Sequence, residues 1–93
     1  SYTALVRRTT AHMQAAHCAE SVGLGLGQIA AFEFYGRLRV VPMQASPSCQ
    51  WLLAEPKSDL SAPGTVDATH WSLHQTIRHP VDQSESVLLF KRK

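Results

Sequence analysis

Hydrophobic and polar positions alternate most clearly in residues 70–78, and such alternation is typical of a strand with one exposed face. Trp71, Leu73 and Ile77 fall on one side of this segment, with Gln75 as the interruption. The other side carries only polar positions: His70, Ser72, His74, Thr76 and Arg78. Two shorter apolar segments, residues 50–54 and 87–90, also predict strands, with a brief helix as the alternative for the first. The second is apolar throughout, which predicts either a central strand or part of a dimer interface.

Residues 23–42 fit two incompatible structures. Read as strands, they form a hairpin in which Phe34 faces Leu38 across a loop centred on Gly36. The same register places Glu33 opposite Arg39 on the other face. Both faces of the hairpin are then satisfied together, so we expect strands here.

Read as helices, the same region resembles the helix-turn-helix of phage repressors. The positions that carry the resemblance are Ala19, Gly23, Ile29, Glu33, Gly36, Arg37 and Pro42. The resemblance implies a first helix that ends near Val22 and a reading helix that begins near Gly27. In that arrangement Gln28 would face the edges of DNA bases.

The first part of the chain predicts a helix. Small apolar side chains recur at helical spacing in residues 11–22 and form one narrow stripe: Ala11, Ala15, Cys18, Ala19 and Val22. Thr9 or Thr10 can cap this helix, and Gly23 can end it. Residues 2–7 alternate weakly, so they form either a short strand or the start of a helix.

Taken together, these elements predict an α+β fold. One N-terminal amphipathic helix packs on a four- to five-stranded, mainly antiparallel sheet. The 93 residues form a single domain, residues 1–93, with a long loop at residues 55–69 that contains Pro56, Pro63 and Gly64.

Composition narrows the class of protein only slightly. The net charge of +2 permits a nucleic-acid partner but does not imply one. No apolar run approaches the ~20 residues of a membrane helix, and the sequence contains no charged-then-apolar leader pattern. We therefore expect no membrane association and a cytoplasmic location.

Cys18 and Cys49 are the two cysteines. Neither belongs to a CxxC pair or lies at zinc-ribbon spacing from a histidine, so buried reduced thiols are the expectation and a disulfide is the alternative. His70 and His74 lie two side-chain steps apart on a strand, which does not suit a metal site. We expect neither a metal nor a cofactor.

The function favoured by the sequence is a small non-catalytic binding module for a small molecule or a protein partner. The candidate ligand-binding residues lie on the polar side of the predicted sheet: Tyr35, Arg37, His70, Ser72 and Thr76. One Ala-rich helix would leave part of the sheet uncovered, and this predicts a homodimer.

An enzyme is the alternative. Small microbial ribonucleases and toxin ribonucleases also place a helix before an antiparallel sheet, a likeness of architecture only. That analogy gives Glu33 the role of base, Arg39 the role of phosphate-binding cation and His74 the role of acid. Arg37 and His70 are the substitutes for the cation and the acid. Such a reaction needs no metal.

Overall fold

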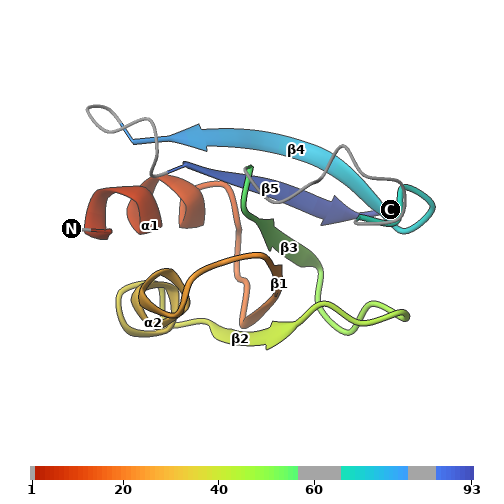
Figure 1. Cartoon of the computed structure of the whole chain (residues 1–93), viewed down its shortest axis with the longest axis horizontal. Helices are drawn as coiled ribbons and strands as arrows, with labels where there is room; N and C mark the ends of the chain where they lie inside the picture. Colours follow the sequence, from red (N-terminus) through yellow and green to blue (C-terminus); the bar gives the residue numbers. More distant parts are fainter. Residues whose placement is uncertain (1, 57–65, 80–85) are drawn as a thin grey trace.

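The computed structural model describes residues 2–56, 66–79 and 86–93, which fold into an α+β arrangement (Figure 1). Two helices and five strands follow one another along the chain. They are α1 (Thr3–Thr10), β1 (Cys18–Val22), α2 (Leu26–Phe34), β2 (Arg39–Pro42), β3 (Trp51–Ala54), β4 (Trp71–Arg78) and β5 (Ser86–Arg92).

The five strands form one mixed sheet in the order β2-β1-β3-β5-β4. β1 pairs in parallel with both β2 and β3, whereas β5 pairs antiparallel with β3 and β4. The prediction of a mainly antiparallel sheet was therefore wrong for its first half. The reason is that α2 connects β1 to β2 as a crossover, and a crossover joins parallel strands.

Both helices pack on the same side of the sheet, which we call the helix face. α1 contacts β4 and β5, while α2 contacts β2 and the first helix. Leu5 and Val6 of α1 meet Phe32 of α2 in the core, and all three are fully buried. Gly36 lets the turn after α2 lie close to α1, since a Cβ there would lie 3.2 Å from Val6 Cγ1 and 3.3 Å from Thr10 Cγ2.

The helix predicted for residues 11–22 is absent. α1 ends at Thr10, and residues 18–22 form β1 instead. Thr9 and Thr10 do not cap a following helix, because their hydroxyls donate back to the carbonyls of Leu5 and Val6 within α1. β1 has neighbours on both sides in the sheet, and these two ladders outweigh the helical spacing of its small residues.

The hairpin predicted around Gly36 is also absent. Residues 26–34 form α2, which buries Gln28, Ala31 and Phe32. Phe32 is fully buried and Phe34 is 76% exposed, although the hairpin placed them on the same face. The helix-turn-helix arrangement does not form either. α2 does begin at Leu26, but a strand precedes it where that motif requires a helix.

The three later strands are confirmed. β3, β4 and β5 cover the predicted segments, and β5 lies between β3 and β4, so its apolar run belongs to an inner strand. β4 contains a bulge: Leu73 pairs with Phe90 and Gln75 with Leu89, which leaves His74 without an opposite residue. The bulge buries Ile77 on the helix face, whereas Trp71 is buried on the opposite face.

The face opposite the helices is covered at β1 by residues 43–49, and we call it the loop face. Glu20 lies here, fully buried next to Ala19, which points to the helices. Its carboxylate accepts backbone N–H bonds from Gln44 at 2.9 Å, Ser48 at 2.9 Å and Cys49 at 3.1 Å. A buried charge needs such partners, so this carboxylate determines where the segment runs.

A disulfide joins Cys18 to Cys49 beside this carboxylate, with Cα atoms 5.7 Å apart. The expectation of reduced thiols was wrong and the alternative holds. The bridge closes a sequence separation of 31 residues, for which loop-closure entropy gives roughly 3–4 kcal/mol of stabilisation. Disulfide and carboxylate together hold the chain between β2 and β3.

Most of the long loop predicted at residues 55–69 lies outside the described residues. Within the described part, neither helix has the length and apolar character needed to cross a membrane.

Replacing Glu20 with Gln tests the buried carboxylate. One carboxylate oxygen becomes an NH2 group that faces a backbone donor, so at least one N–H loses its acceptor. We expect Glu20→Gln to lower the free energy of unfolding by about 1–3 kcal/mol, measured by urea denaturation at one protein concentration.

Glu33→Gln is the matched control, because Glu33 is exposed on α2. It should change the unfolding free energy by no more than about 0.5 kcal/mol. Equal effects of the two substitutions would show that the carboxylate does not hold residues 43–49.

Candidate functional site

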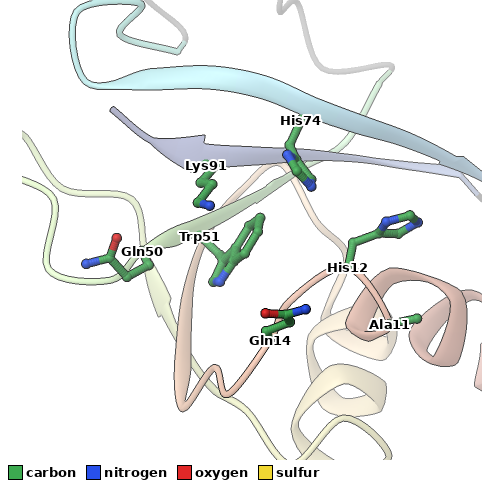
Figure 2. A pocket seen from close by; sticks show the side chains of 7 residues that line it. All are labelled: Ala11, His12, Gln14, Gln50, Trp51, His74 and Lys91. Carbon is green, nitrogen blue, oxygen red and sulfur yellow. The ribbon is translucent and has the colours of Figure 1, made fainter.

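A cleft of about 520 Å³ opens where the end of α1 meets the ends of β3 and β5 and the middle of β4. Figure 2 shows seven residues that line it within the described part of the chain: Ala11, His12, Gln14, Gln50, Trp51, His74 and Lys91. This volume lies within the range of small-molecule sites. None of these seven residues is acidic, whereas three carry or can carry positive charge.

Trp51 forms the floor of the cleft. Its indole is buried, with 6% of the residue exposed, and it lies between Lys91 and His74 (Figure 2). Lys91 Nζ is 5.5 Å from the centre of the Trp51 ring, a cation–π contact. The His74 ring meets the indole edge-on at 5.3 Å, and His12 meets His74 edge-on at 6.1 Å.

The sheet register brings Lys91 and Trp51 together. These residues are directly paired between β3 and β5, so their side chains leave the same face of the sheet. His74 comes from the bulge in β4, where the extra residue is free to lean over β5. Gln50 precedes β3 and follows Cys49, so the disulfide anchors this wall of the cleft.

The opposite wall is the turn that follows α1. It carries His12 and Gln14, and Met13 between them is buried in the core. Ala15 adopts a φ of 53°, the left-handed region, which costs a non-glycine residue roughly 1–2 kcal/mol. Such strain is found disproportionately near functional sites. In this chain it reverses the backbone directly after Gln14.

A second hollow of about 380 Å³ adjoins the cleft and shares Ala11 and His12 with it. Arg8 of α1 and Thr76 of β4 belong to its lining. The Arg8 guanidinium lies across it, with Nη1 3.5 Å from the carbonyl oxygen of Arg78. A second cation therefore stands close to the cleft.

The three residues assigned to a ribonuclease site are not brought together. Glu33 lies on α2, Arg39 on β2 and His74 on β4. Strands β2 and β4 are the two opposite edges of the sheet, with three strands between them. Of the three, His74 alone lines the cleft.

The candidate ligand-binding residues also lie in separate parts of the structure. Tyr35 and Arg37 lie in the turn after α2 and are exposed. Thr76 lines the adjoining hollow, and the Ser72 hydroxyl donates to the carbonyl of Lys91 at 3.4 Å. His70 lies in the turn that leads into β4.

That turn is organised by Asp67. Its Oδ1 accepts the Thr69 hydroxyl at 2.6 Å and the Thr69 N–H at 2.9 Å, and its Oδ2 lies 2.7 Å from His70 Nδ1. The hydrogen bond from the Thr69 hydroxyl, followed by the Thr69 N–H and His70, lowers the pKa of Asp67 from 3.8 to about 2. His70 is thus held by a local carboxylate.

Sequence reasoning missed five of the residues that line the cleft and have polar or aromatic side chains: His12, Gln14, Gln50, Trp51 and Lys91. No spacing connects them, because they come together only through the pairing of β3 with β5 and the turn after α1. Within residues 2–56, 66–79 and 86–93, no three His, Cys, Asp or Glu side chains are grouped as a metal site would require.

No protein-family model, curated protein or solved structure shows significant similarity to this chain.

The turn at Asp67 gives a pH prediction. Because the folded pKa is depressed, the stabilisation that this carboxylate gives the turn is complete above about pH 4 and is lost as the pH falls through about 2. A carboxyl ¹³C titration should show the Asp67 midpoint near 2.

Thr69→Ala removes the hydroxyl, the largest cause of the shift, and keeps the backbone N–H. The Asp67 midpoint should then rise part of the way towards 3.8. An unchanged midpoint in this variant would show that the hydroxyl does not bind the carboxylate in solution.

Proposed function

We propose that this chain is a non-catalytic binding module whose cleft accepts a small anionic molecule. The observation that carries the proposal is the composition of the lining: Lys91 and His74 contact one indole, His12 contacts His74, and no carboxylate lies among the described lining residues. An anion would meet an unopposed positive field there.

The geometry supports a ligand with one charged and one flat part. Lys91 is exposed, so its ammonium can exchange water for an oxyanion without leaving the Trp51 ring. Gln14 and Gln50 are exposed at the rim, where their amides can donate hydrogen bonds. The imidazoles offer further donors and flat surfaces against which a planar ligand can pack.

The nearby acids support binding rather than catalysis. Glu20 is committed to three backbone N–H groups on the loop face, and Asp67 is committed to Thr69 and His70. The cleft therefore has imidazoles but no carboxylate or hydroxyl in its lining to orient or activate them.

The disulfide bears on where such a module would work. Structural disulfides persist in oxidising compartments and are rare in the cytosol. The Cys18–Cys49 bridge thus supports an oxidising compartment over the cytoplasmic location that the sequence alone suggested.

Titration with phenyl phosphate, followed by the indole N–H and side-chain amide signals in NMR spectra, tests the proposal. We expect saturable shifts at Trp51, Gln14 and Gln50, with phenol as the neutral comparison giving weaker binding. Lys91→Ala should weaken binding of phenyl phosphate about 10- to 100-fold, because it removes a charged hydrogen-bond donor.

Lys93→Ala is the control of equal charge change, since Lys93 is exposed and is not part of the lining. It should leave affinity within about twofold, because a lone surface charge contributes little. If both lysine variants lost the same affinity, the effect would be one of net charge and the cleft would not be the site.

A further inference from the structure

The outer side of α2 is apolar, although it faces away from the sheet. Gln28, Ala31 and Phe32 form the buried side of this helix. Leu26 and Phe34 are 85% and 76% exposed, and Ala30 between them is exposed as well. These three residues are four positions apart, so they form one straight stripe along the helix.

A hollow of about 370 Å³ adjoins this stripe. Its lining is apolar or aromatic: Tyr2, Gly27, Ala30, Ala31, Phe34 and Tyr35. Tyr35, 51% exposed, extends the apolar surface beyond the end of the helix. Ala30 is small, so another backbone can come close to α2 at this point, whereas the Tyr2 ring lies against Gly27, 3.3 Å from where a Cβ would stand.

We infer that this surface binds a second copy of the chain, with the two α2 helices antiparallel. The stripe is compatible with a two-fold axis through its centre. A bulky residue stands at each end and alanine stands in the middle, so the rotation places a bulky residue against a bulky residue. Leu26 of one protomer then packs on Phe34 of the other, and the two Ala30 residues meet at the axis. This is an isologous interface.

Length and area favour a second copy over a smaller ligand. Leu26 and Phe34 are eight positions apart, roughly 12 Å along a helix, and a partner helix of the same length covers both. Leu26, Phe34 and Tyr35 together expose on the order of 400 Å², about half of the ~800 Å² that each partner buries in a stable complex. Tyr2 and Ala30, which line the adjoining hollow and are not in this sum, add to the area that a partner can cover.

The dimer surface and the cleft do not share a residue. α2 packs beside β2, at the opposite edge of the sheet from β4, which carries His74 (Figure 1). Dimerisation therefore leaves both clefts open, and its test does not depend on whether the cleft binds an anion.

Sedimentation equilibrium across a range of concentrations tests the interface. The unchanged protein should be a dimer, and Ala30→Arg should raise the dissociation constant at least tenfold, because two guanidinium groups would meet at the axis. Arginine is a good helix former and Ala30 is exposed, so this variant should fold, as circular dichroism can verify. Ala4→Arg, at an exposed alanine of α1, should leave the dimer intact.

A cysteine at the axis gives an independent readout. Ala30→Cys should form a covalent dimer on mild oxidation, since the residue lies opposite itself, whereas Ala4→Cys should not. A parent protein that stays monomeric up to roughly 1 mM would overturn the inference. So would a dimer that is insensitive to Ala30→Arg, or one that Ala30→Cys does not cross-link.

Discussion

The buried carboxylate of Glu20 is the constraint on which the rest of the structure depends. Among the described residues it has no cationic partner, and its oxygens accept hydrogen bonds from the backbone N–H groups of residues 44, 48 and 49. A buried carboxylate is tolerated only if hydrogen-bond donors surround it. Residues 43–49, which form neither helix nor strand, therefore follow a defined path around Glu20. β3 then begins two residues after Cys49, at Trp51, and the Trp51 side chain lines the cleft. A polar residue in the sheet thus positions an aromatic one on its opposite face.

Local pattern was sufficient to locate the strands in the second half of the chain, but not the bulge in β4, which puts Trp71 and Ile77 on opposite faces although the alternation placed them on one. β3, β4 and β5 are formed by side chains whose faces are set by their own alternation or by burial on both sides. The prediction failed for the first half of the chain because the spacing of its apolar residues fits both a helix and a strand. Ala19 and Glu20 belong to a strand only because β2 and β3 flank them, and α2 is apolar on both sides, so no face stands out.

The candidate site was partly predictable. His74 was identified because it stands on the polar side of an alternating segment. Its neighbours in the cleft could not be predicted from the sequence. Trp51 and Lys91 come together because β3 pairs with β5, and these strands are far apart in the sequence. The same strand order separates Arg39 from His74. Residue types that suit a reaction thus say little until the order of strands is known.

The mixed sheet divides the molecule into two halves with different physical character. The parallel half, β2 and β1, carries α2 and its apolar outer surface. The antiparallel half, β5 and β4, carries the basic cleft. β3 pairs with both halves, and its four residues are buried. β3 therefore lies between the two surfaces, and α1, which packs on α2 and ends at the cleft, connects them a second time.

The bulge in β4 places one residue of the cleft outside the strand pairing that builds the sheet. Every other residue of this strand from Trp71 to Arg78 has an opposite partner on β5, whereas His74 has none. Without His74, the remaining residues of β4 would form a regular ladder with β5, in which Trp71 still pairs with Arg92 and Ile77 with Val87. His74 is thus a residue that the pairing of β4 with β5 does not require, so the position that brings an imidazole into the cleft lies outside the ladder that holds the strand in the sheet.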